Sequence, residues 1–101
     1  MAVLPSVLEA VDGRCEVWVD GGIRSGQSVL KAIAMGADAA MVGRPWLYGL
    51  GAYGEDGVRL SLEMIHKELD ISMAFCGKTQ IADVDGSIIF AGSGKITAKC
   101  T

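Results

Sequence analysis

The sequence is poor in the side chains that most often bind metal ions. Its 101 residues include one histidine, His66, and three cysteines, Cys15, Cys76 and Cys100. The cysteines are far apart and form no Cys-x-x-Cys pair, so we expect reduced thiols rather than disulfides or a zinc site. His66 falls within a segment of helical periodicity, where a solvated imidazole is the usual state of a lone histidine. We therefore predict no metal site and assign His66 no catalytic role.

The sequence also lacks an excess of positive charge. Nine Lys and Arg residues against twelve Asp and Glu residues give a formal net charge of −3, and the basic residues are dispersed. Proteins that bind nucleic acids usually concentrate basic residues into a patch or stripe. We therefore expect no nucleic-acid partner.

Long apolar runs are missing as well. The longest uncharged stretches are rich in glycine and fall short of the roughly 18 to 20 apolar residues needed to cross a bilayer. The segment "MAVLPSVLEAVDG" has no basic residue and does not resemble a secretory signal, and "AKCT" is not a peroxisomal address of the Ser-Lys-Leu type. A content of 50% hydrophobic and 21% charged residues is typical of one small globular domain. We expect a cytoplasmic protein without a membrane span.

What the sequence does contain is an alternation of helical and strand-like segments. Short runs rich in Val, Ala and Trp predict buried strands at Cys15 to Asp20 and at Ala39 to Gly43. Apolar residues at spacings of three and four predict helices, with Ser25 as one N-cap, over residues 5–11, 26–36 and 58–76. A helix between two strands requires a parallel pair with a right-handed crossover. The apolar side of the last helix is expected to pack against the sheet.

Two glycine-rich segments, each with an arginine, follow the two predicted strands. "DGGIRSG" begins at Asp20 and "VGRPW" begins at Val42. Glycines let backbone N–H groups converge without a Cβ in the way, and the following helix adds its positive N-terminal end, so both features favour a phosphate dianion. Arg24 and Arg44 would each add a charge-assisted fork to the phosphate oxygens. We predict that two neighbouring strand ends hold one phosphate.

Other interpretations of these residues stay open at this point. A single Gly-Gly after a strand is most often only a tight turn, and it is the pairing of two such segments that favours a ligand. Asp20 either hydrogen-bonds a ribityl or ribose hydroxyl of a ligand or only caps its own turn. In an eight-stranded βα barrel the loops after strands 7 and 8 are the usual phosphate site, which makes these two strands candidates for that pair.

Most of the chain, from Val3 to about Val84, resembles the C-terminal portion of the FMN-dependent α-hydroxy acid dehydrogenases and oxidases, such as glycolate oxidase and lactate oxidase. The motifs that carry the resemblance are "VLPSVLEAV", "DGGIRSGQSVLKAIAMGADAAMVGRPWLYGL", "GEDGV" and "ELDISMAFCG". The resemblance implies an α/β fold, the C-terminal part of a TIM barrel, with strand 7 at Cys15 to Asp20 and strand 8 at Ala39 to Val42. Residues 1–84 would be this barrel segment, incomplete as a barrel, and residues 85–101 an irregular tail.

The resemblance also implies a cofactor and a reaction. FMN would be held through its phosphate and ribityl chain by Asp20, Gly21, Gly22, Ile23, Arg24, Gly43 and Arg44. The implied reaction is oxidation of a 2-hydroxy acid, of the lactate or glycolate type, to a 2-oxo acid. In the family a histidine that exchanges the substrate proton and an arginine that binds the substrate carboxylate lie in a Ser-Asn-His-Gly-Gly-Arg type segment, which is not in this sequence. We therefore expect no catalytic residue here and no turnover from this chain alone.

Two alternatives remain beside this interpretation. Inosine monophosphate dehydrogenases also resemble "DGGIR" and "KAIAMGADAAMVG", so a phosphate- or nucleotide-binding barrel fragment is one alternative, although "GRPWLYGL" and "GEDGV" favour the flavin family. A non-catalytic fragment that assembles with other chains is the second. Two strands with their helices leave sheet edges and apolar surface uncovered, so we expect a homo-oligomer or assembly with the missing barrel portion.

Overall fold

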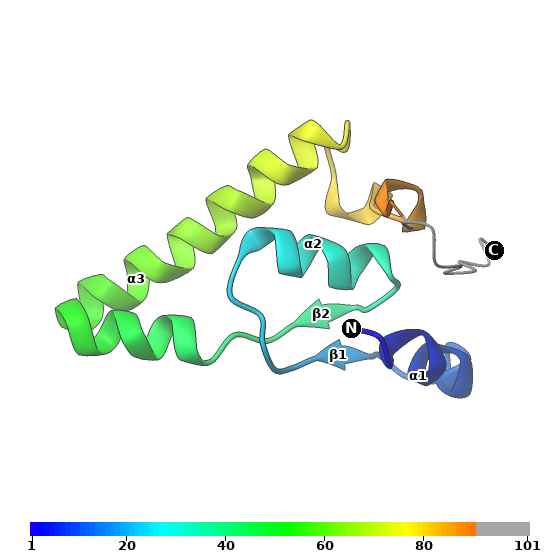
Figure 1. The fold of residues 1–101 in the computed structure, drawn as a ribbon, viewed down its shortest axis with the longest axis horizontal. Coiled ribbons are helices and arrows are strands. Elements are labelled where there is room, and N and C mark those ends of the chain that lie inside the picture. The colour runs from blue at the N-terminus through cyan, green and yellow to red at the C-terminus, as the bar shows by residue number, and fades with distance from the viewer. Residues whose placement is uncertain (91–101) are drawn as a thin grey trace.

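Helices and strands alternate along the chain in the computed structural model, which describes residues 1–90. The elements are α1 (Leu4–Val11), β1 (Trp18–Val19), α2 (Gly26–Ala34), β2 (Ala39–Ala40) and α3 (Arg44–Phe75), followed by the 3-10 turns η1 (Ile81–Asp83) and η2 (Gly86–Ile88). Figure 1 shows the two strands side by side, with α2 along one side of the pair and α1 before β1. No helix within residues 1–90 is long and apolar enough to cross a membrane.

The two strands are parallel neighbours, as the sequence predicts, but each is only two residues long. Their register places Trp18 opposite Ala39 and Val19 opposite Ala40. The predicted strands, Cys15 to Asp20 and Ala39 to Gly43, are therefore too long. Just beyond β1 the backbone takes positive φ angles at two consecutive glycines, and beyond β2 it enters α3 at Arg44, so the ladder has no room to continue.

An aspartate fixes the start of the strand ladder. The carboxylate of Asp38, just before β2, accepts a hydrogen bond from the N–H of Val17 at 2.7 Å. The N–H of Asp38 donates in turn to the Val17 carbonyl at 2.9 Å, and at the other end of the ladder the N–H of Met41 donates to the Val19 carbonyl at 2.8 Å. These bonds hold the two strands together in the absence of further strands within the described residues.

Helix α2 covers one face of the strand pair. Its N-cap is Ser25, as predicted, with the hydroxyl accepting a hydrogen bond from the Ser28 N–H at 3.2 Å. A buried cluster of Leu4, Val17, Ala32 and Ala37 joins α1 and α2 to the segments that precede the two strands. The other face is open within residues 1–90, where Trp18 is 59% exposed and Met41 is 48% exposed.

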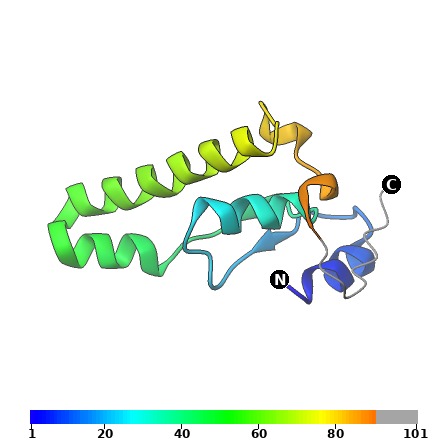
Figure 2. The same cartoon turned by 45° about the horizontal axis from the view of Figure 1, so that its top comes forward.

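Helix α3 begins at Arg44, well before the position that the sequence predicts. Non-helical backbone at Tyr53 and Gly54, where Gly54 has a φ of +61°, bends it into two arms over residues 44–52 and 55–75. Figure 2 shows the two arms folded back on one another. They meet at Gly49 and Gly57, where a Cβ on either glycine would overlap the backbone carbonyl of the other. Only the second arm has a sustained apolar period, which is why the sequence indicates no helix over residues 44–52.

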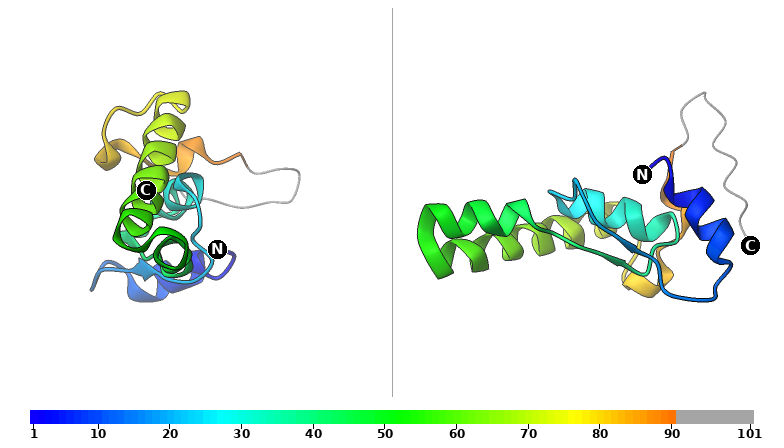
Figure 3. Two further views of the ribbon diagram at one scale, coloured as in Figure 1. Left: turned by 90° about the vertical axis from the view of Figure 1, so that its left-hand side faces the viewer. Right: turned by 90° about the horizontal axis from the view of Figure 1, so that it is seen from below.

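The second arm of α3 packs mainly against α2 rather than against the strands. A second buried cluster, formed by Leu30, Ala34, Met73 and Val84, lies between these helices and the turns that follow them. Figure 3 shows from two further sides how α2 runs along this arm. The prediction that the helix packs directly on the sheet is therefore wrong. The face of a two-stranded sheet is narrow, and α2 already covers it.

The segment after Asp85 contains a short 3-10 turn. Asp85 accepts hydrogen bonds from the hydroxyl and the N–H of Ser87, and these bonds hold the pKa of the Asp85 carboxyl below its usual value. Ile88 and Ile89 pack against the second buried cluster. The remainder of the predicted tail, residues 91–101 with Cys100, lies outside the described residues, and the division at residue 84 stays a prediction.

The close approach of the α3 arms predicts opposite effects at two neighbouring glycines. Gly49→Ala should lower the free energy of unfolding by about 1–3 kcal/mol, because the new methyl group would overlap the Gly57 carbonyl. Gly51→Ala should raise it by up to about 1 kcal/mol, because Gly51 is helical and a Cβ there meets no atom within 4 Å. Urea unfolding followed by circular dichroism measures both, and equal changes would contradict the close crossing.

Candidate functional site

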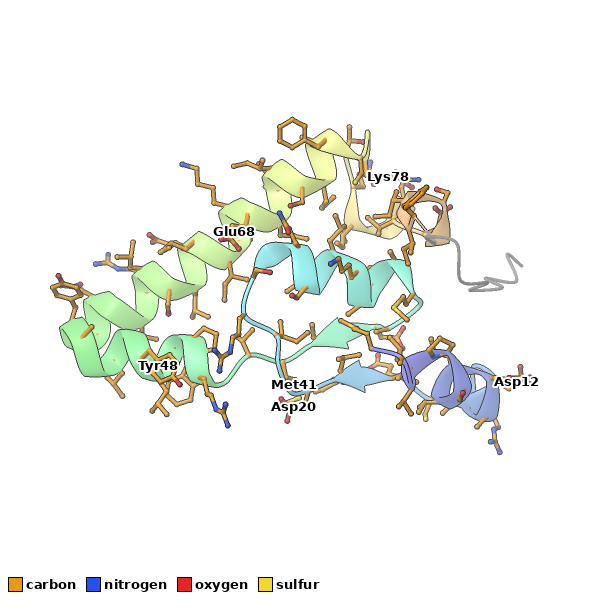
Figure 4. The ribbon with its side chains drawn as sticks, viewed as in Figure 1. Asp12, Asp20, Met41, Tyr48, Glu68 and Lys78 are labelled. Atoms are coloured by element: carbon orange, nitrogen blue, oxygen red, sulfur yellow. The ribbon has the colours of Figure 1, made fainter. Side chains whose placement is uncertain are left out.

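The residues that follow the two strands line one recess. It has a volume of about 260 Å³ and is formed by Asp20, Gly21, Gly22, Ile23, Arg24, Met41, Gly43, Arg44 and Pro45. We call residues 20–24 the first loop and residues 43–45 the second loop. All seven residues singled out from the sequence belong to this recess, and Met41 and Pro45 are additional. Figure 4 shows Asp20 beside Met41 at this end of the strand pair.

The first loop owes its shape to two consecutive glycines. Gly21 has a φ of +95° and Gly22 a φ of +72°, in the region that side chains with a Cβ rarely adopt. A Cβ at either position would meet no atom within 4 Å, so backbone conformation rather than crowding favours glycine here. Asp20 caps this turn, because its Oδ1 accepts a hydrogen bond from the Gly21 N–H at 2.8 Å. Capping is thus one role that the structure gives Asp20.

Both loops that line the recess contain backbone N–H groups without a hydrogen-bond partner among the described residues. The N–H groups of Gly22, Ile23, Arg24, Gly43 and Arg44 donate to no acceptor within residues 1–90. The buried Ile23 side chain, 4% exposed, anchors the first loop while its neighbours face solvent. Because unpaired N–H groups are strong donors, a group of them in two loops that line one recess favours binding of an anion.

Two guanidinium groups add positive charge to the same recess. Arg24 comes from the first loop and Arg44 from the second, and both are exposed. Neither forms an ion pair with a carboxylate in the described part of the chain, whose salt bridges join Arg59 to Asp56 and Lys78 to Asp85. The only carboxylate among the lining residues is that of Asp20. The recess therefore carries a net positive charge suited to a phosphate.

The helix end that the sequence assigns to this site, the N-terminus of α2, is occupied by protein groups. The Gly26 N–H donates to Oε2 of Glu68 on α3 at 2.8 Å, and the Ser28 N–H donates to the Ser25 hydroxyl. Neither Ser25 nor Gly26 lines the recess. The predicted contribution of the α2 N-terminus to anion binding is therefore wrong in this structure, because a carboxylate from a distant part of the chain takes that position.

The N-terminus of α3 borders the recess in its place. Its N-cap, Gly43, has no side-chain hydrogen bond to the helix, and Arg44 and Pro45 form its first turn. The indole N–H of Trp46 donates to the Val42 carbonyl at 3.0 Å and fixes this turn against the end of β2. A helix N-terminus carries a partial positive charge, so α3 supplies the favourable helix end. This helix end exists because residues 44–52 form a helix, which the sequence pattern does not predict.

The size of the recess limits what it can enclose. Pockets for whole small-molecule ligands begin at roughly 300 Å³. A recess of about 260 Å³ with donors from two loops suits one end of a cofactor, such as a phosphate with the first atoms attached to it. The remainder of a larger cofactor would extend beyond these residues.

The described residues offer no comparable site for a metal ion. Within residues 1–90 no group of three or more His, Cys, Asp or Glu side chains is placed to hold one. His66 is exposed on the second arm of α3, away from the recess, and Cys15 and Cys76 are free and exposed. The chemistry of the recess is therefore that of backbone N–H groups and guanidinium groups.

This geometry predicts which residues bind inorganic phosphate. Arg24→Ala and Arg44→Ala should each weaken phosphate binding roughly tenfold, because each removes a charge-assisted hydrogen bond. Arg59→Ala is the matched control, since Arg59 is paired with Asp56 and does not line the recess. Titration monitored by amide NMR shifts measures the affinities, and the largest shifts should fall on residues 22–24 and 43–44. Equal losses in all three variants would contradict the site.

Comparison with known proteins gives a family match over most of the chain. The family model for FMN-dependent dehydrogenase matches residues 1–91. L-lactate oxidase of Nostoc sp. is 44% identical over 86 residues, which are 85% of this chain and 24% of that protein. The peroxisomal (S)-2-hydroxyacid oxidase of Arabidopsis thaliana is 49% identical over 84 residues, which are 83% of this chain and 23% of that protein.

A solved structure shows the same likeness in three dimensions. A mandelate oxidase mutant with the monooxide FMN adduct superposes with a TM-score of 0.76 and 48% identity, over 80% of this chain and 26% of that chain. The chain thus spans about a quarter of the length of the relatives it matches. Since the family match extends over all the described residues, the chain belongs to the FMN-dependent dehydrogenases, a family of oxidoreductases whose cofactor is FMN.

Proposed function

We propose that this chain supplies the phosphate-binding part of the FMN site in an enzyme that oxidises a 2-hydroxy acid to a 2-oxo acid. The observation that carries the proposal is the convergence of the seven residues on one recess with five unpaired backbone donors. The names of the relatives support the reaction class, since lactate and mandelate are both 2-hydroxy acids. The family match also favours this function over the inosine monophosphate dehydrogenase-like alternative.

In this proposal the two loops hold the phosphate from two sides. The N–H groups of residues 22–24 and 43–44 donate to its oxygens, and the guanidinium groups of Arg24 and Arg44 balance its charge. Donors fixed by glycine turns and a helix end need little rearrangement, so binding costs little conformational entropy. FMN, when bound, supplies the redox chemistry that converts the alcohol to a carbonyl.

Asp20 has a second role in the proposal. Its Oδ1 already accepts the Gly21 N–H, which orients the carboxylate at the rim of the recess. A carboxylate has capacity for further hydrogen bonds, so Asp20 accepts one from a ribityl hydroxyl as well as capping its turn. The two roles that the sequence left as alternatives are therefore compatible.

The position of these strands in a larger barrel is also a proposal. We assign β1 and β2 to strands 7 and 8 of a TIM barrel, where the loops at the carboxyl ends form the usual phosphate site. The exposed side of the pair, with Trp18 and Met41, would then face the barrel interior, and the helices would lie outside. The remaining strands would come from the rest of a longer protein or from an assembly partner.

The recess itself contains no group suited to take a proton from an alcohol. Its lining residues include no histidine, and the one carboxylate, that of Asp20, is assigned to the Gly21 N–H and to a ribityl hydroxyl. We therefore propose that the proton-exchanging histidine and the substrate-binding arginine lie outside these residues, so that the chain alone does not turn over. The cytoplasmic location and the homo-oligomer stay predictions.

A comparison of flavins tests the cofactor assignment. The purified chain should quench FMN fluorescence on binding. Riboflavin lacks the phosphate and cannot form the charge-assisted hydrogen bonds, so it should bind at least about tenfold more weakly. Addition of lactate or glycolate should leave the flavin oxidised. Equal affinity for FMN and riboflavin would contradict the phosphate assignment. Bleaching of the flavin by either acid would contradict inactivity of the isolated chain.

A further inference from the structure

A single polar contact joins the helices that leave the two loops. Oε2 of Glu68, on the second arm of α3, accepts the Gly26 N–H at 2.8 Å, although the residues are 42 positions apart. Within residues 1–90 it is the only side-chain hydrogen bond between α2 and α3. Figure 4 shows Glu68 on α3 facing the start of α2.

The backbones of the two helices also approach one another closely at this point. A Cβ on Gly26 would overlap backbone atoms of Ile65, Glu68 and Leu69, so no side chain larger than glycine fits there without separating the helices. Gly26 is buried, and the contact is partly shielded from water. A hydrogen bond to a charged acceptor in such a setting is among the stronger ones in proteins.

The contact lies close to the first loop along the chain and is linked to the second loop through the two arms of α3. Gly26 comes two residues after Arg24 of the first loop. Glu68 lies on the second arm of α3, which packs at Gly57 against Gly49 of the arm that begins with Arg44 of the second loop. The short strand ladder joins the loops directly, and the contact between Glu68 and Gly26 joins the start of α2 to the second arm of α3. A shift between α2 and α3 would therefore change the separation of Arg24 and Arg44.

We propose that Glu68 is a positioning residue for the cofactor phosphate, an inference that rests on the proposed function. Its carboxylate holds the start of α2 against α3 and so sets the spacing of the two loops that grip the anion. A competing explanation is that Glu68 only neutralises the positive end of α2. The two explanations depend on different properties of the side chain. Positioning depends on its length, and neutralisation depends on its charge.

Two conservative variants separate these explanations. Glu68→Asp keeps the charge but withdraws the carboxylate by one methylene, so it should weaken binding of inorganic phosphate roughly five- to tenfold. Glu68→Gln keeps the length and an amide oxygen that accepts the Gly26 N–H, so its affinity should stay within about threefold of the wild type. Affinities are measured on the 101-residue chain by NMR titration, with hydrogen exchange of the Gly26 amide faster in Glu68→Asp.

Met73→Ala is the control for a merely structural role. Met73 is buried between α2 and α3 but does not touch Gly26 or the recess, so its truncation should lower the Tm without changing phosphate affinity at a temperature where all variants are folded. Equal loss of affinity in Met73→Ala and Glu68→Asp would overturn the positioning role, as would wild-type affinity in Glu68→Asp or tighter binding in Glu68→Gln. Absence of phosphate binding by the wild type would overturn the proposed function together with this inference.

Discussion

The parallel pairing of β1 and β2 is the constraint on which the site depends. Parallel strands end at the same edge of a sheet, so the loops that leave them must start side by side. In this chain the pairing is short, and the carboxylate of Asp38 secures its first residue through the Val17 N–H. An antiparallel pair would place the two loops at opposite ends, and no common recess could form.

Backbone conformation then decides which donors remain available at that edge. Positive φ angles at Gly21 and Gly22 turn the chain before its N–H groups can join a ladder or a helix, and Gly43 begins α3 without a side-chain cap. At α2 the opposite happens, because Ser25 and Glu68 accept its first N–H groups. The fold thus satisfies one helix end internally and leaves the other free beside the recess, and in the proposed function this difference would direct an anion to a single place.

The sequence predicts the local features of this site better than the long-range ones. The paired motifs after the strands identify seven of the eight loop residues, and Ser25 is recognisable as a cap, because glycine, arginine and capping preferences act over a few residues. The sequence does not predict the first arm of α3, since Gly49 and Gly51 interrupt its apolar period and Gly49 lets the two arms touch. The contact of Glu68 with Gly26 is equally hidden, because nothing local marks a carboxylate that caps a distant helix.

The proposed site would couple anion binding to the stability of the fold. The two loops line one recess only when β1 and β2 are paired and α2 lies against α3, so an anion that uses both loops would bind the folded chain in preference to the unfolded one. At a concentration a hundred times its Kd, such a ligand adds about 2.7 kcal/mol to the free energy of unfolding. Small domains are stable by only about 5–15 kcal/mol in total, and here one face of the strands is uncovered within residues 1–90. A phosphate held between the loops would therefore stabilise the folded chain by linking the two loops at the carboxyl ends of β1 and β2.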